Sequence, residues 1–301
     1  MTSKQKGIIA LIGAAVLSGT FGVYSRYVGA DFPPVYQAAV RNVVQLVILI
    51  GLFLLPIGRG KSVVKADWKW FLFRSMCGMV NAILMYIAFT RISISTTYFL
   101  SFAAATVCGY ILGSSLFRER IKRQGLIAVA LAIIGLGFVY SVDFQVSTLW
   151  YSLAAVLAGI LAPGWSVFSK AISSHYSNIQ TNLIDTAFAA IVSVALAFIL
   201  HEKLTPIAWN GQWAAVLGFA IVSLVVMILT VYGFKRIEAQ LGTLLLLLEV
   251  VAGIVLGYLF YRQTVSASSA IGGSMILVAI YLRTRASIEL PYYIRHVTGK
   301  K

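Results

Sequence analysis

Long apolar segments, separated by short polar or basic connections, make up most of the chain. A helix needs about 20 mostly apolar residues to cross about 30 Å of hydrocarbon. Ten segments have about that length: Ile8–Tyr27, Val35–Leu55, Trp68–Phe89, Ile94–Phe117, Gly125–Ser141, Leu149–Ser169, Ile179–Leu200, Trp213–Phe234, Ala239–Tyr261 and Val265–Leu282. The pattern predicts an all-α membrane protein with ten transmembrane helices.

The lysines and arginines indicate which connections face the cytoplasm, because basic loops resist translocation. With the N-terminus inside, 18 of the 24 basic residues fall on the cytoplasmic side. The opposite side holds only Arg26, Arg91, Lys203 and Arg262, and Arg41 and Arg74 lie within spans. The asymmetry predicts a multi-pass protein of the bacterial inner membrane with both termini in the cytoplasm.

The composition agrees with a lipid environment, because 60% of the residues are hydrophobic and only 11% are charged. Soluble proteins have roughly 25% charged residues. A net charge of +15 could indicate a nucleic-acid partner. The basic residues are instead spread over the connections between spans, so topology and anionic lipid headgroups explain them. We therefore expect contacts with membrane lipids and none with nucleic acid.

The two halves of the chain repeat each other. Ala14–Gly19 recurs as Ala154–Gly159 at an offset of 140 residues, and Phe21–Arg26 recurs as Trp165–Lys170 at an offset of 144. The four extra residues lie beside Pro163 and Gly164. They predict that the sixth helix is kinked or partly unwound there, whereas the first helix is not.

Each half contains five predicted spans, and an odd number requires the second half to enter the membrane upside down. The domain prediction is a first repeat over residues 1–145, an inverted second repeat over 146–285 and a basic tail over 286–301. Two inverted halves that meet at a central cavity are typical of transporters.

Several short motifs recur in a fixed order along the two halves. They are Ser25-Arg26, Arg41, Leu116-Phe117-Arg118-Glu119, Ser169-Lys170 and Leu246-Leu247-Leu248-Glu249. In order and repetition, residues 8–284 resemble the EamA family of the drug/metabolite transporter superfamily. The chain departs from the family pattern at Val250, where a proline commonly follows the glutamate, and at Gln263, which replaces the helix-ending acid of the second half.

The resemblance implies secondary transport by alternating access, often export of amino acids or related metabolites, without ATP hydrolysis in the chain. The sequence agrees on the last point, because no G-x-x-x-x-G-K-[ST] phosphate loop occurs. An ion or substrate gradient, a proton gradient among them, is the expected driving force.

Charged residues within spans are the first candidates for a site, because each costs roughly 2.5–3.5 kcal/mol on insertion scales. Glu249 lies near the middle of its span and is either a cation or proton site or a structural carboxylate. Arg41 and Asp185 stand at repeat-equivalent positions, where a structural role is favoured over substrate contact. Arg74 lies near a span end, from which its side chain can reach the headgroups.

Aromatic and amide side chains supply a second group of candidates for an amphipathic pocket. They are Asn81, Tyr86, Tyr98, Phe102, Trp165 and Phe168. Aromatic residues at helical spacing serve packing or an interfacial belt more often than ligand contacts. Trp165 is better placed than the others, because irregular backbone at membrane depth is tolerated where it lines a cavity.

Small residues at four-residue spacing predict close helix packing at Gly109, Gly113, Gly253 and Gly257. These faces join either the fourth and ninth spans of one chain or two chains, so the sequence is compatible with a monomer and with a homodimer.

Other classes of function find less support in the sequence. The histidines, His175, His201 and His296, show no close metal-ligand spacing, and Cys77 and Cys108 lie within apolar runs. We therefore expect no enzyme, no metal and no cofactor, and favour transport over a membrane-embedded lipid enzyme or a non-catalytic scaffold. A zwitterionic amino acid suits a cavity with a carboxylate and an arginine, but a nucleotide-like or sulfonium metabolite and either direction of transport remain open.

Overall fold

The computed structural model describes residues 1–28, 32–56, 60–140, 146–172, 176–208 and 210–297, with the side chains of 286 and 288–297 left aside. His175 and residues 298–301 of the predicted tail lie outside the described residues. Within this part of the chain the regular structure is entirely helical. The all-helical prediction is confirmed there.

The helices follow the predicted spans closely. The first half forms α1 (Ser3–Ser18), α2 (Phe21–Val28), α3 (Pro34–Leu54), α4 (Trp68–Phe89), α5 (Ile94–Phe117) and α6 (Arg123–Val139). The second half forms α7 (Leu149–Val167), α8 (Asn178–Ile199), α9 (Gly211–Phe234), α10 (Ala239–Leu246), α11 (Leu248–Tyr261) and α12 (Ala267–Val297). Short 3₁₀ turns η1 (Lys65–Asp67), η2 (Val146–Thr148) and η3 (Phe168–Lys170) join them.

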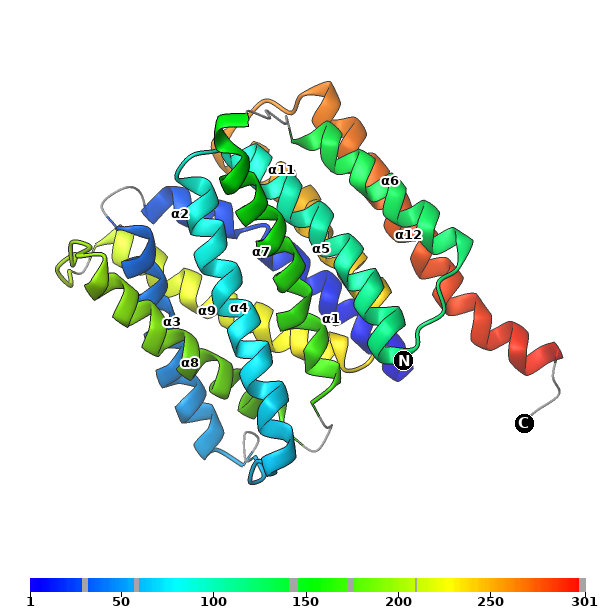
Figure 1. Ribbon diagram of the computed structural model, residues 1–301, viewed down its shortest axis with the longest axis horizontal. Helices are drawn as coiled ribbons and strands as arrows, with labels where there is room; N and C mark the ends of the chain where they lie inside the picture. Colours follow the sequence, from blue (N-terminus) through cyan, green and yellow to red (C-terminus); the bar gives the residue numbers. More distant parts are fainter. Residues whose placement is uncertain (29–31, 57–59, 141–145, 173–175, 209, 298–301) are drawn as a thin grey trace.

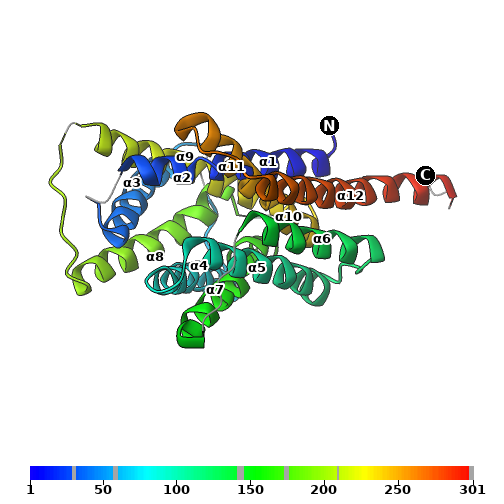
Figure 2. The same cartoon turned by 90° about the horizontal axis from the view of Figure 1, so that it is seen from above.

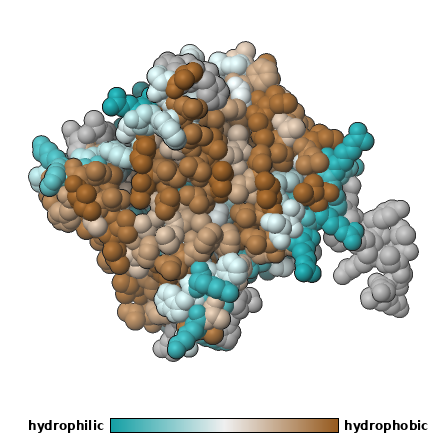
Figure 3. Space-filling model, in the orientation of Figure 1, coloured by the Kyte–Doolittle hydropathy of each residue, from teal (hydrophilic) through white to brown (hydrophobic). Residues whose placement is uncertain are grey.

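Most of the ten predicted spans correspond to helices that are long and apolar enough to cross a membrane. Among the described residues, nine helical stretches are long and apolar enough to cross a membrane, with α1–α2 and α10–α11 each taken as one. The place of the fifth predicted span is taken by α6, an apolar helix of 17 residues. Brown, apolar side chains cover much of the face in Figure 3, as a lipid-facing surface requires. Ten spans and cytoplasmic termini stay predictions.

The helix breaks fall at other places than the sequence predicted. The sixth span, α7, runs through Pro163 to Val167, so the predicted unwinding at Pro163 and Gly164 is wrong, and a kink there stays a prediction. The first span is the broken one, because α1 ends at Ser18 and α2 begins at Phe21. Four extra residues make about 1.1 helical turns, so α7 can include them with a phase change of only about 40°. Proline's φ is compatible with a helix, although Pro163 donates no backbone hydrogen bond.

Helices at equivalent positions of the two halves pack antiparallel to each other, as inverted copies require. α6 and α12 are equivalent in the 144-residue register and pack side by side, and their colours run in opposite directions in Figure 1. α3 and α8 are also antiparallel neighbours, because Tyr36 bonds Glu202 near one end whereas Gln180 bonds Lys61 near the other. These two pairs lie at opposite ends of the long axis, with the other helices between them (Figures 1 and 2).

The central helices exchange partners between the halves. α4 of the first half packs on α7 of the second, and α9 of the second packs on α1 of the first. The largest buried apolar cluster joins α1, α5, α6, α7 and α9–α12, with Leu11, Leu136, Leu244 and Ile276 fully buried. The two repeats therefore share one core, and neither buries its central helices alone.

Candidate transport site

Glu249 lies at a break in the ninth span. α10 ends at Leu246 and α11 begins at Leu248, which places Glu249 in the first turn of α11. The helix dipole favours a carboxylate at this end. The side chain is half-buried, and no hydrogen bond or ion pair joins it to another described residue. A mid-span carboxylate without a protein cation is available to a substrate cation or a proton.

Four aromatic rings form a cluster near Glu249. Tyr98 stacks with Phe102 at 5.7 Å between centroids and with Tyr140 at 6.1 Å, and Phe89 meets the Tyr98 ring edge-on at 5.5 Å. Phe102 and Tyr140 pack against the apolar cluster that contains Val250, and Leu248 packs against the same cluster, so this cluster reaches both chain neighbours of Glu249. A carboxylate beside aromatic faces suits an organic cation, because the carboxylate and the aromatic faces both attract positive charge.

The sequence identified only part of this aromatic cluster. Tyr98 and Phe102 were predicted pocket residues, whereas Phe89 and Tyr140 were missed. Both missed residues lie at span ends, Phe89 as the last residue of α4 and Tyr140 directly after α6. Aromatic residues at span ends are usually assigned to an interfacial belt, so the sequence pattern conceals them.

Asp185 is the centre of a second, closed cluster. Its carboxylate pairs with Arg74 and accepts hydrogen bonds from Ser75 Oγ and Trp165 Nε1, both at 2.6 Å. The Arg74 guanidinium lies 4.8 Å from the Trp165 ring centroid and is 0% exposed. The prediction that Arg74 reaches toward the headgroups is therefore wrong, and Asp185 pairs with Arg74 instead of Arg41.

Arg41 has a different environment from Arg74. Its guanidinium carbon lies 4.1 Å from the centroid of the Phe219 ring on α9. Its Nε is buried without a hydrogen-bond partner, and the residue as a whole is half-buried. No acidic side chain of the described residues forms an ion pair with Arg41.

The remaining predicted pocket residues lie in packing contacts or apart from Glu249. Asn81 Nδ2 donates to the Ala158 carbonyl at 2.7 Å and so links α4 to α7. Phe168 is 6% exposed and packs against Trp70 and Phe73. Tyr86 is half-buried on α4. No described contact joins Asn81, Tyr86 or Phe168 to Glu249.

The glycine faces are used unequally. A Cβ on Gly109 would collide with Thr243, and one on Gly113 would crowd Gln240, so both glycines let α5 approach α10 of the same chain. A Cβ on Gly253 would meet nothing within 4 Å, and on Gly257 only Gln263. The packing role predicted for Gly253 and Gly257 is therefore not seen within the chain. The break at Leu247 separates them from the segment that packs on α5.

Two carboxylates outside the spans hold helix ends together. Glu119 closes one of the family motifs, whereas no sequence pattern pointed to Glu238. Glu119 accepts the backbone N–H groups of Ala239 and Gln240 at the start of α10 and the Lys170 ammonium at 2.6 Å. Glu238 pairs with Lys4 and Arg283. Burial raises the pKa of Glu238, but these cations outweigh it and leave the pKa below its usual value.

Cationic groups crowd together near the end of α9. Burial, assisted by Arg74 and Arg236, lowers the pKa of Lys235 to about 8. The Lys235 ammonium donates to the Tyr176 carbonyl at 3.1 Å. This end of the bundle therefore holds several positive charges, of which Asp185 neutralises Arg74.

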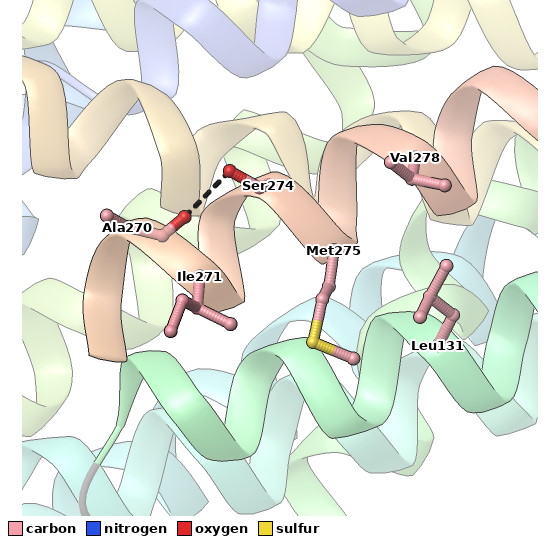
Figure 4. Close-up of a pocket in the computed structure, with 6 residues that line it drawn as sticks. All are labelled: Leu131, Ala270, Ile271, Ser274, Met275 and Val278. Atoms are coloured by element: carbon pink, nitrogen blue, oxygen red, sulfur yellow. Dashed lines mark hydrogen bonds between the residues drawn. The ribbon is translucent and has the colours of Figure 1, made fainter. Parts of the chain in front are cut away.

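A groove between α6 and α12 lies apart from these charges (Figure 4). Its lining is almost entirely apolar: Leu131, Ala270, Ile271, Ser274, Met275 and Val278. The Ser274 hydroxyl is bonded to the Ala270 carbonyl of its own helix. The groove offers no charged group that could fix a polar substrate.

Comparison with known proteins decides the family. Residues 5–141 and 149–285 each match the model of the EamA-like transporter family. The chain belongs to the EamA-like transporter family. The resemblance seen in the motifs is thus confirmed, and membership in a family of transporters fits the expectation that the chain is not an enzyme.

Relatives of this EamA-like chain are distant but cover nearly all of it. An uncharacterized transporter of Archaeoglobus fulgidus is 24% identical over 288 residues, which are 93% of this chain and 96% of that protein. The pseudopaline exporter CntI of Pseudomonas aeruginosa is 22% identical over 276 residues, or 90% and 94%. A solved crystal structure shares the fold with a TM-score of 0.78 at 18% identity, covering 95% of this chain and 99% of the other.

Proposed function

We propose that this EamA-like protein is a secondary-active transporter of small amphipathic metabolites in a bacterial inner membrane. Amino acids and related compounds are the favoured substrates, ahead of nucleotide-like or sulfonium metabolites, and export is the favoured direction. The observation that carries the proposal is the unpaired, half-buried Glu249 carboxylate beside the aromatic cluster of Phe89, Tyr98, Phe102 and Tyr140.

The energetics of Glu249 support a role in transport. A carboxylate inside a span costs roughly 2.5–3.5 kcal/mol unless a cation or a proton neutralises it. Asp185 recovers this cost from Arg74, Ser75 and Trp165, whereas no described residue neutralises Glu249. The neutralising partner of Glu249 is therefore a substrate ammonium or a proton, and both couple the residue to transport.

The architecture supports alternating access. Each central helix pair combines one helix from each inverted half, α4 with α7 and α9 with α1. Rocking one pair against the other would open either side of the membrane in turn. The relative CntI is named a pseudopaline exporter, and this name supports export as the direction of transport.

The first prediction is that the Glu249→Gln variant, reconstituted in proteoliposomes, loses either substrate affinity or the pH dependence of its flux. If a substrate ammonium binds Glu249, the variant keeps its fold but loses affinity by about 1.5–3 kcal/mol, because a charge-assisted hydrogen bond is lost. If a proton binds there, substrate binding survives while the pH dependence of flux between pH 5 and 8 disappears. Flux of a mixture of amino acids and its pH profile are measured together.

Glu202→Gln is the matched control for this experiment. Glu202 accepts hydrogen bonds from the first backbone N–H groups of α3, and an amide oxygen can replace part of that role. We expect the control to transport as the wild type does. Wild-type flux and pH profile in well-folded Glu249→Gln protein would instead make Glu249 a structural residue. A wild-type protein that moves no solute would favour a lipid enzyme or a scaffold.

A further inference from the structure

Arg41 and Asp185 occupy equivalent positions in two copies of one structural motif. At an offset of 144 residues, Arg41 corresponds to Asp185 and Phe21 to Trp165. At the same offset, Arg74 corresponds to Gly218 and Ser75 to Phe219. Both sets converge in the structure: Asp185 contacts its three neighbours, Arg41 stacks on Phe219, and Phe219 packs against Phe21 at 5.0 Å. Because the halves are inverted, the two clusters lie toward opposite ends of the bundle.

The copy around Asp185 is electrostatically complete. The carboxylate has one ion pair and two hydrogen bonds, and the whole residue is 4% exposed. A buried charge is tolerated on these terms, because paired opposite charges and hydrogen bonds replace its lost hydration. Asp185 therefore has its counter-charge within the chain and little accessible surface for a further ligand.

The copy around Arg41 lacks the counter-charge. The position of the charged partner is held by Gly218, and the hydrogen-bond donors Ser75 and Trp165 are replaced by Phe219 and Phe21. A Cβ on Gly218 would meet the Tyr24 ring at 3.1 Å, so an aromatic face covers this place. Arg41 is left with a cation–π contact, which supplies no negative counter-charge.

Arg41 points into the bundle and not toward lipid. The exposed stripe of α3 consists of Val43, Val47, Ile50 and Leu54. Arg41 lies about 150° round the helix from the centre of that stripe. Its neighbour one turn on, Gln45, is 3% exposed and donates to the Ala220 carbonyl and to Ser223 Oγ of α9. Arg41 shares this inward face but keeps an accessible surface, unlike Arg74.

We propose that Arg41 binds a carboxylate group of the transported substrate at the end of the bundle opposite to the Arg74–Asp185 pair. The proposal rests on the transport function proposed above and narrows its substrates to carboxylate-bearing metabolites. A guanidinium presents a planar fork of donors that matches a carboxylate, and stacking on Phe219 holds that plane.

The test uses purified full-length protein in proteoliposomes and two matched probes. One probe is an equimolar mixture of the proteinogenic amino acids without aspartate and glutamate, and the other is the mixture of their α-carboxamides, which keep the amine and have no carboxylate. The variants are Arg41→Gln, Arg41→Lys and, as control, Arg91→Gln, which makes the same change at an exposed loop residue. Uptake is followed by mass spectrometry, and folding by thermal melting and size-exclusion chromatography.

We expect wild-type protein and Arg91→Gln to carry amino acids and not their amides. Arg41→Gln should lose about 10- to 100-fold in uptake at low substrate, and Arg41→Lys less, because it keeps the charge but not the fork. Two outcomes would overturn the carboxylate site while transport stands. One is equal uptake of the acids and the amides by the wild type, and the other is undiminished uptake of the acids by folded Arg41→Gln protein. If the wild type carries neither mixture, amino-acid transport fails and the carboxylate site fails with it.

Discussion

At the scale of single residues, the charges inside the bundle are neutralised in different ways. Arg74 and Asp185 are buried and neutralise each other, whereas Glu249 and Arg41 have no charged partner among the described residues. The first pair fixes how α4 and α8 pack. The two unpaired charges remain available to a solute. The same distinction predicts different outcomes of mutation. Substitutions in the pair should reduce stability, whereas substitutions of the unpaired charges should reduce transport.

The stability of the Arg74–Asp185 pair can be tested with three variants. Asp185→Asn leaves the Arg74 charge buried without its counter-charge, so we expect about 3–5 kcal/mol of destabilisation and a clear fall in the detergent melting temperature. Arg74→Met should destabilise similarly, because Asp185 then becomes the unpaired charge. The double variant Arg74→Met with Asp185→Leu should recover most of the loss, since well-packed apolar side chains can replace a buried ion pair. Single variants as stable as the wild type would contradict this account.

At the scale of helices, a capping carboxylate of the first half holds the start of α10 in the second half. Glu119, which follows α5 and its left-handed cap at Arg118, accepts the free N–H groups at the start of α10. Its repeat equivalent Gln263 follows a matching cap at Arg262 but holds no helix start among the described residues. The capping glutamate therefore acts on one side only, and it stabilises the short helix that precedes the break at Leu247 and Glu249.

Glu119→Ala should loosen α10 without unfolding the bundle. Loss of a helix cap costs about 0.5–2 kcal/mol, and the released N–H groups of Ala239 and Gln240 should exchange with deuterium faster. Hydrogen–deuterium exchange with mass spectrometry over residues 239–246 measures the effect. Gln263→Ala is the matched control and should leave this segment unchanged. Equal exchange in Glu119→Ala and the wild type would show that Glu119 does not cap α10.

At the scale of the whole molecule, the inverted halves and the basic connections together make a prediction about topology. α6 and α12 are equivalent and antiparallel, so the connection before α6 and the start of α12 belong on opposite sides of the membrane. The connection of Arg118–Arg123 is strongly basic and that around Arg262 is not. The positive-inside rule then assigns the first to the cytoplasm.

Reporter fusions test this orientation directly. A reporter inserted in the 118–123 connection and one fused after Arg285 should both give cytoplasmic signals, because ten spans bring the chain back to the side on which it began. A reporter inserted beside Arg262 should give a periplasmic signal and serves as the internal control. A periplasmic signal from either of the first two sites would contradict the ten-span topology.

The sequence by itself determined the helices and the repeat. The predicted spans Trp68–Phe89 and Ile94–Phe117 coincide with α4 and α5, because a lipid environment makes the length of an apolar run decisive for a helix. The 144-residue register and the family motifs were also readable from the chain, and the family match bears them out. Glu249 could be chosen because a charge in the middle of an apolar run is costly wherever the helix packs.

Only the tertiary structure decided which residues meet and where helices break. Arg74 could pair with Asp185 because α4, α7 and α8 come together, and sequence spacing does not show contacts across more than a hundred residues. The helix continues at Pro163 and breaks at Leu247, since neighbouring helices and caps such as Glu119 outweigh local propensity. The burial of Arg74 and the accessibility of Arg41 arise in the same way, from the inter-helix packing that surrounds each charge.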